Sequence, residues 1–427
     1  MRTINRSWIR TVALASAVSL AVACEGDFLD VPDPTVIDAE TIDPVLDLPT
    51  FARSALQNLF DAFDNVVVYS AWFSGEAYVG DTFPTRNDIG RRVVEYSNGT
   101  LRDELYFPLA RAISTNETVL EVLRESGVSN AEAASTANFA SAYAIVLMAE
   151  NFCEVVISRG YADADLGAPV PATAAMDSAI ARFDAAIVAA TADGNDDIVD
   201  AANVGKARAY LFLERYPEAI AAAALVPADF EYMVPKVDDP SFRGRLGNTV
   251  WSFTLQRASI VVPTYYRALN DPRIEYRLWT NAAGAAIKSQ GNDFDFYGQE
   301  KYPGWAAPLR LSSGLEARYI SAEAQLKSGQ PAAAEALIAE RNEPGSASGD
   351  DIDFVADTGT LVQLLDQKAR DFWLEAIHTG DWRRNAGLTP YVAPEGAPYY
   401  ADEVGGNFGE VTCMPTPQRE VDNNPNY

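Results

Sequence analysis

The residues KARAYLFLERYPEAIAAAALV (206–226) and EARYISAEAQLKSGQPAAAEALIAER (316–341) are the most informative part of the sequence. Each predicts an alanine-rich helix, a short break, and a second helix that opens at a proline, Pro217 or Pro331. Gly329 supplies the stop between the two helices of the second stretch. Alanine lets paired helices approach closely, and both stretches resemble tetratricopeptide units, which stack to bury a shared core. The sequence therefore predicts a mainly α scaffold of tetratricopeptide-like helix pairs.

Three further segments show helical periodicity. Apolar residues recur at three- and four-residue steps from Ser135 to Ile157 and from Gln363 to His378. Another helix is expected to start at Asp177, as its N-cap, and to end near Gly194. We therefore expect the tetratricopeptide-like helices mainly in residues 105–227 and 313–378.

Residues 60–100 and 230–312 differ from these blocks, since they are rich in Gly, Pro, Asn, Asp and aromatic residues. They contain only short strand-like runs, at 249–254 and 260–262. Long irregular stretches in a compact protein often carry function, so we expect these two to form a loop-rich ligand-binding face. No boundary separates independent domains, and residues 24–427 are expected to form one domain.

Composition excludes several classes of function. The chain has 427 residues, of which 48% are hydrophobic, which is enough to bury a large core. Its net charge of −27 would repel nucleic acid. A single histidine, His378, cannot build a His-rich metal cage, and no motif indicates a metal or another cofactor.

The first 23 residues have the features of a signal peptide. Arg2, Arg6 and Arg10 precede an apolar run, Thr11 to Val22, that is too short to span a membrane. The small residues that follow lead to Cys24, an arrangement that resembles a bacterial lipobox. We expect cleavage after residue 23 and lipid on Cys24, which would attach the chain to a membrane without spanning it. Secretion with an unmodified Cys24 is the alternative.

Cys153 and Cys413 remain once Cys24 is assigned to the anchor. An even pair of cysteines in an exported protein is expected to form a disulfide. Two free thiols are the alternative.

Six segments, in order along the chain, resemble a known family. They are residues 24–30 (CEGDFLD), 113–117 (ISTNE), 140–152, 315–324, the pair 370–375 (RDFWLE) and 380–384 (GDWRR), and the ending 415–420 (PTPQRE) with Asn424 and Pro425. Together they resemble the SusD/RagB family of outer-membrane nutrient-binding lipoproteins. The helical motifs have a structural interpretation, in which Asp381 and Arg383 pair with neighbouring elements.

The resemblance implies a SusD-like helical scaffold with a large irregular loop-rich region and a few short strands. It also implies a non-catalytic lipoprotein, anchored at the cell surface in the outer membrane. Such a protein would bind an oligosaccharide or a peptide and deliver it to a SusC-like TonB-dependent transporter.

Sugar rings present apolar faces edged by hydroxyl groups, so exposed loop aromatics beside polar side chains are the first candidates for ligand contact. In the first irregular stretch the candidates are Trp72, Tyr78, Asp81, Arg86 and Asn87. The second stretch adds five aromatic candidates, with Arg267 nearby in sequence: Tyr265, Tyr266, Trp279, Tyr297 and Trp305. The alternative for each aromatic residue is that it fixes its loop onto the scaffold.

Two other classes of function stay open. A helical-barrel glycoside hydrolase also combines helices, aromatic subsites and carboxylates, and needs no histidine. A helical-repeat scaffold would bind another protein and carry no small-molecule cargo.

Overall fold

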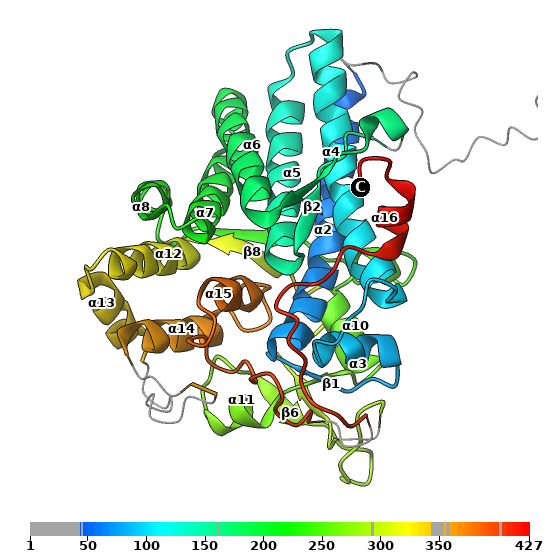
Figure 1. The fold of residues 1–427 in the computed structure, drawn as a ribbon, viewed down its shortest axis with the longest axis vertical. Helices are drawn as coiled ribbons and strands as arrows, with labels where there is room; N and C mark the ends of the chain where they lie inside the picture. The colour runs from blue at the N-terminus through cyan, green and yellow to red at the C-terminus, as the bar shows by residue number, and fades with distance from the viewer. Residues whose placement is uncertain are drawn as a thin grey trace, which may run out of the picture. The chain divides into compact units, whose positions relative to one another are not determined.

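The computed structural model describes residues 43, 46–160, 162–291, 294–342, 354–355, 359–400 and 404–427. Figure 1 shows a helical scaffold in which successive helices pack side by side. Five of the long helices that build it are α2 (Leu48–Ser74), α4 (Phe107–Ser126), α5 (Ala131–Asn151), α6 (Ala172–Asp193) and α7 (Asp196–Phe212). The predicted leader and Cys24 lie outside the described residues.

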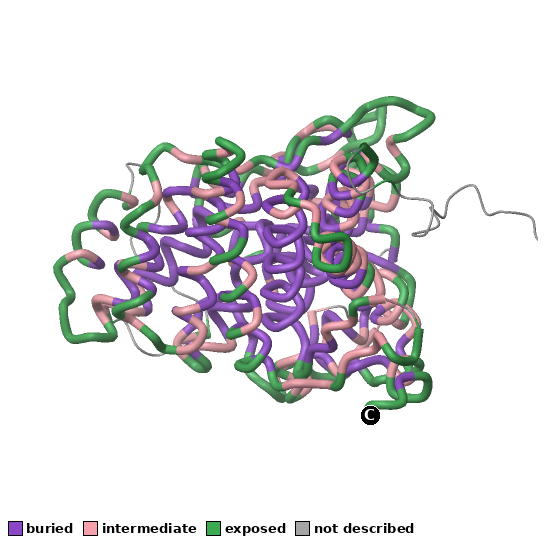
Figure 2. Tube along the Cα trace, turned by 90° about the horizontal axis from the view of Figure 1, so that it is seen from above, coloured by how far each residue is buried: buried purple, intermediate pink, exposed green. Residues whose placement is uncertain are grey.

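Helix α5 forms the centre of this scaffold. It is apolar or small on all sides and almost entirely buried, in contact with α2, α4 and α6. The side chain of Asn130 caps its first turn by accepting a hydrogen bond from the amide of Ala133 at 3.0 Å. Buried residues follow the packed helices, whereas exposed residues follow the connecting loops (Figure 2).

The two predicted helical hairpins are confirmed. The first consists of α7 and α8 (Tyr216–Ala223), and the second of α12 (Gly314–Lys327) and α13 (Ala332–Arg341). Gly329 lies between α12 and α13 with φ 81°, a conformation that glycine adopts without strain. Alanines from α7, α8 and α12, among them Ala207, Ala222 and Ala324, form one buried cluster between the hairpins. The mainly α fold class is likewise confirmed.

Five local predictions are wrong. The helix expected to continue to Ile157 ends at Asn151, and residues 154–156 form a strand. Residues 60–74 are helical, because α2 continues through apolar positions to Gly75 (φ 88°). Residues 249–254 form helix α10 (Thr249–Leu255), since the side chain of Asn248 caps the turn at the Trp251 amide. Helix α6 starts at residue 172, so Asp177 lies inside it. The helix expected over 363–378 divides into α14 (Thr360–Asp371) and α15 (His378–Arg384), with positive φ at Leu374 and Ala376 between them.

Short antiparallel strands hold the irregular segments. A four-stranded sheet has the order β1 (Tyr78–Val79), β5 (Ile260–Val261), β7 (Tyr297–Gln299) and β6 (Tyr276–Leu278). Two-stranded sheets join β4 (Glu231–Val234) to β8 (Leu309–Ser313) and β2 (Glu154–Val156) to β3 (Pro169–Pro171). The strand expected at 260–262 is therefore present.

The predicted disulfide between Cys153 and Cys413 is confirmed, with the two Cα atoms 5.1 Å apart. The neighbouring residues Phe152 and Met414 form a parallel β-bridge beside it. The disulfide fastens the C-terminal segment to the end of α5.

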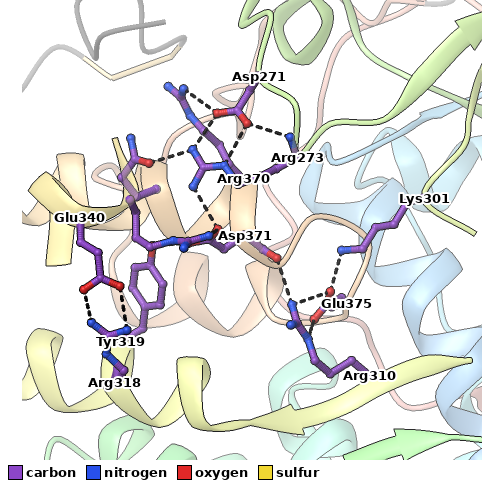
Figure 3. A network of polar contacts seen from close by, with 12 residues as sticks. Asp271, Arg273, Lys301, Arg310, Arg318, Tyr319, Glu340, Arg370, Asp371 and Glu375 are labelled. Atoms are coloured by element: carbon purple, nitrogen blue, oxygen red, sulfur yellow. Dashed lines mark hydrogen bonds and ion pairs between the residues drawn. The ribbon is translucent and has the colours of Figure 1, made fainter. Parts of the chain in front are cut away.

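A buried polar network connects α12, α13 and α14 to the second irregular stretch (Figure 3). The carboxylate of Asp371 accepts hydrogen bonds from Tyr319 at 2.6 Å, from Arg341 at 2.6 and 2.9 Å and from Arg273 at 3.0 Å. Burial acts to raise the pKa of Asp371, but these donors outweigh it and hold the pKa below its usual value.

A second part of the network centres on Glu375, which accepts from Lys301 at 2.6 Å and from Arg310 at 2.9 Å. Lys301 and Arg310 belong to the segment that precedes α12, so the helical scaffold fixes the position of the loop-rich stretch.

The predicted structural role of the 380–384 motif is confirmed. Asp381 pairs with Lys368 at 2.6 Å and with Arg384. Arg383 donates to the backbone carbonyls of Ala149 and Phe152 at the end of α5. No described helix combines the length and apolar character that crossing a bilayer requires.

Candidate functional site

The four-stranded sheet brings the two irregular stretches together. Tyr78 of the first stretch pairs with Val261 of the second, and Val261 in turn pairs with Gly298. Thr264 extends the link, since its hydroxyl lies 3.1 Å from the hydroxyl of Tyr78.

A pocket of about 510 Å³ lies beside this sheet. It is lined by Tyr78, Val261, Thr264, Arg267, Lys288, Phe294, Asp295, Tyr297 and Tyr400. These residues come from both irregular stretches and from the C-terminal segment. The lining combines aromatic surface with a few polar groups, which is the composition expected of a small-molecule site.

Three aromatic rings form one wall of the pocket. Tyr78 and Tyr400 are stacked, with ring centroids 3.8 Å apart and planes at 21°. Phe294 packs beside both rings at 5.5 and 5.7 Å. The hydroxyl of Tyr400 accepts a hydrogen bond from the amide of Val79 at 2.8 Å, which fixes the ring in place. Burial raises the pKa of Tyr400 well above its usual value, so this hydroxyl stays protonated.

Tyr297 and three charged residues also line the pocket. The guanidinium carbon of Arg267 lies 3.8 Å from the centre of the Tyr297 ring, close enough for a cation–π contact. Lys288 and Asp295 pair with each other at 2.8 Å, and both are about half exposed. In the described ranges, no group of three His, Cys, Asp or Glu side chains is arranged to hold a metal ion.

Of the predicted ligand residues, Tyr78 and Tyr297 line the pocket, although Tyr78 does not have the predicted exposure, since only 9% of its surface is accessible. Tyr265 lies directly behind it, 5.8 Å from the ring of Tyr78, and its hydroxyl donates to the carbonyl of Gly75. Tyr266 is fully buried and packs against Tyr391 at 4.7 Å. Tyr265 and Tyr266 therefore support the wall of the pocket from the protein side.

Trp72 does not have the exposure that we predicted, because it lies inside α2 with 1% of its surface accessible. Its ring packs against Tyr69 at 5.2 Å and Phe253 at 5.5 Å. The periodicity of α2 therefore places this tryptophan in the core.

Asp81, Arg86 and Asn87 are buried, and both Arg86 and Asn87 donate hydrogen bonds to Asp81. Arg86 donates to Asp81 at 2.7 Å and to Glu104 at 3.1 Å, and Asn87 donates to the Asp81 carbonyl at 2.8 Å. These contacts place the short helix α3 (Pro84–Gly90) and leave none of the three side chains exposed to a ligand.

The two remaining candidates do not line the pocket. Trp279 is partly exposed and packs against Trp251 and Phe296, with Arg277 over its ring at 4.3 Å. Trp305 is buried, with Arg243 over its ring at 5.0 Å. Both fix loops onto the protein, which is the alternative interpretation of such residues.

Sequence reasoning missed Thr264, Lys288, Phe294, Asp295 and Tyr400. A local signal existed for Tyr400, which follows Tyr399 in a segment rich in Gly, Pro and Ala. No feature of the sequence indicated that this segment returns to β1, some 320 residues earlier.

Two other pockets are less suited to a sugar. A groove of about 380 Å³ between α8, α12 and α13 is lined mostly by alanines and crossed by the Arg318–Glu340 ion pair at 2.5 Å. A pocket of about 170 Å³ lies beside Arg92 and Trp382. As far as their described linings go, neither offers stacked aromatic rings beside polar side chains, so the aromatic pocket is the better candidate.

No protein-family model matches the sequence, and neither does any curated protein. Solved structures do match. A SusD superfamily protein from Parabacteroides distasonis is 12% identical, with a TM-score of 0.63 over 90% of this chain and 98% of that one. A SusD-like carbohydrate-binding protein from Bacteroides fragilis is 13% identical, with a TM-score of 0.62 over 88% and 98%.

Surface glycan-binding protein A from Bacteroides uniformis is similar to the same degree, at 13% identity and a TM-score of 0.60 over 88% of this chain and 98% of that one. At these identities the likeness shows the fold. The predicted resemblance to the SusD/RagB family is thus confirmed in three dimensions: the chain has the SusD-like fold.

Proposed function

We infer that this chain, which has the SusD-like fold, is a surface-exposed glycan-binding protein without catalytic activity. The aromatic pocket carries the proposal, because a sugar ring can stack on the Tyr78–Tyr400 wall while its hydroxyl groups reach Thr264 and Asp295. Similar structures that are named as glycan- or carbohydrate-binding proteins support the same class of ligand.

The charged lining argues against a glycoside hydrolase. Most such enzymes need two carboxyl groups on either side of the bond that breaks. Of the described lining residues only Asp295 carries a carboxylate, and it is paired with Lys288. The pocket is therefore better suited to hold a sugar than to hydrolyse it.

The leader and Cys24 supply the second part of the proposal. Cleavage before Cys24 and lipidation of its thiol tether the chain to the outer membrane, where it passes its ligand to a SusC-like TonB-dependent transporter. Metabolic labelling with a clickable fatty acid tests the tether, since Cys24→Ser should abolish labelling and release the protein from membranes.

Calorimetric titration with a panel of oligosaccharides and peptides tests the ligand class. We expect an oligosaccharide to bind and Tyr297→Ala to weaken it at least about tenfold, because the substitution removes a pocket wall. Tyr216→Ala is the matched control, since Tyr216 is a partly exposed tyrosine on α8, away from the pocket. Failure of every oligosaccharide and peptide to bind would favour the protein-binding scaffold, and turnover of any oligosaccharide would favour the hydrolase.

A further inference from the structure

Among the described residues that line the aromatic pocket, one positive charge has no carboxylate that neutralises it. Lys288 and Asp295 cancel each other, being 2.8 Å apart. Arg267 is the other charged lining residue in the described part of the chain. The described lining thus carries a net positive charge, although the whole chain carries −27.

Arg267 lies on the short helix α11 (Thr264–Ala268) with its guanidinium over Tyr297. Among the described residues, no carboxylate forms an ion pair with it and no acceptor receives a hydrogen bond from its side chain. Its Nε atom is enclosed and lacks an acceptor, so water does not compensate that donor.

Arg273, only a few residues away in sequence, is an arginine with a structural role, and its side chain has several hydrogen-bond partners. It donates to Asp271 at 2.6 Å, to Asp371 at 3.0 Å and to Gln367 at 2.8 Å. The Arg370 guanidinium similarly pairs with Asp366 and Asp271. Among the described residues Arg267 has no comparable partners, and it lines the pocket. Its terminal N–H groups, which are not enclosed as Nε is, are therefore available to a ligand.

We propose that this pocket takes an acidic saccharide, with the carboxylate of a uronic acid unit bound by the guanidinium of Arg267. The proposal rests on the glycan-binding function inferred above and names the class of glycan. A guanidinium presents paired N–H donors in a plane that matches a carboxylate, which makes this pair stronger than a bond to a neutral hydroxyl group.

The pocket supports this pairing in two ways. Tyr297 lies against one face of the guanidinium and restricts its position, so less side-chain freedom is lost when a carboxylate binds. The negative charge of the protein as a whole acts weakly here, because salt screens charges beyond about 8 to 10 Å. The nearby guanidinium of Arg267 therefore dominates the electrostatic interaction with the carboxylate of a bound uronic acid.

The test compares ligands that differ only in charge. Binding of oligogalacturonides and oligoglucuronides is measured by calorimetry beside their methyl esters, which keep the sugar and remove the carboxylate. We expect wild-type protein to prefer at least one acid over its ester by about tenfold. Higher ionic strength should reduce that preference.

Arg267→Gln should remove the preference for the acid while leaving the affinity for the ester nearly unchanged. Arg257→Gln is the matched control, because Arg257 is also partly exposed, lies over a ring (Phe253, 4.8 Å) and has no carboxylate partner among the described residues. It should keep the preference.

Three other outcomes would contradict the proposal. Equal affinity for every acid and its ester would overturn it while leaving glycan binding intact. A stronger preference for sulfated chains than for uronates would overturn the carboxylate assignment. Failure of all oligosaccharides to bind, acidic and neutral alike, would overturn the glycan-binding function itself and this inference with it.

Discussion

The rings of Tyr78 and Tyr400 stack at 3.8 Å between centroids, and the hydroxyl of Tyr400 accepts from the amide next to Tyr78, that of Val79. A residue near the C-terminus thereby completes a wall that begins at the end of α2. Gly75 turns the chain between α2 and β1 with φ 88°, and a Cβ there would lie 2.7 Å from the carbonyl of Tyr391. The same C-terminal segment thus packs against both the turn and the wall.

Tyr400 should separate ring stacking from hydrogen bonding. Tyr400→Phe keeps the stack and loses one hydroxyl, so oligosaccharide affinity should fall by less than about threefold. Tyr400→Ala removes the stack and should reduce affinity about tenfold or more. Calorimetry gives both values, with circular dichroism to confirm folding. An equal loss in the two variants would show that the hydroxyl, and not the ring, matters.

The disulfide should make a large contribution to stability. Cys153 and Cys413 are separated by 260 residues, and closing a loop of that length is worth about 5 to 6 kcal/mol in the chain-entropy model. We therefore expect reductant to lower the free energy of unfolding of the wild type in urea titrations. The double variant Cys153→Ser/Cys413→Ser should start from the lower value and show no response to reductant. Identical curves for wild type with and without reductant would exclude this role.

Asp371 should be the most sensitive residue of the polar network in Figure 3. Asp371→Asn removes the charge that Arg341 and Arg273 share, and breaking a buried ion pair costs about 3 to 5 kcal/mol. Glu340→Gln is the control, because its pair with Arg318 is half exposed and should contribute about 1 kcal/mol or less. Equal losses in chemical denaturation would show that the network does not hold the loop-rich stretch.

Glu76 should make stability depend on pH. Its side chain is fully buried and burial raises its pKa to about 8, against 4.5 as the usual value, although the amide of Leu374 donates to it at 3.0 Å. The unfolded chain therefore releases this proton at lower pH than the folded one. The contribution of Glu76 is fully present below pH 4.5 and is lost as pH rises towards 8.

Glu76→Gln removes the titrating group and keeps the shape of the side chain. Between pH 5 and 8 the free energy of unfolding should therefore fall less in the variant than in the wild type, and the two falls should differ by roughly a few kcal/mol. Urea titrations at both values measure the difference. Glu335→Gln, at an exposed position on α13, should follow the wild type. If Glu76→Gln also follows it, the carboxyl group is not protonated in the folded protein at pH 5 to 8.

The helical hairpins could be predicted because their signals are local: alanines at the contact face, Pro217 or Pro331 at a helix start, and Gly329 between helices. The disulfide followed from the parity of the cysteines. The predictions for Trp72 and for residues 249–254 are wrong for different reasons. The glycine-rich sequence after Trp72 obscures the helical periodicity of α2. Residues 249–254 include β-branched and aromatic residues, which occur in short capped helices as well as in strands.

The candidate site was only partly predictable for a different reason. Tyr78 and Tyr297 are predicted as candidates because they are loop aromatics, but only their place in the pocket lining separates them from a supporting residue such as Tyr266, and that place depends on the tertiary fold. Tyr400 reaches the pocket through its ring stack on Tyr78 and the hydrogen bond that its hydroxyl accepts from the Val79 amide, contacts that no short-range pattern encodes.

A crystal structure of the protein with its best-binding oligosaccharide locates the ligand without any inference from variants. We expect density for a sugar ring against Tyr78, Tyr297 and Tyr400. Density in the groove between α8, α12 and α13 instead, with the aromatic pocket empty, would show that the site has been wrongly assigned.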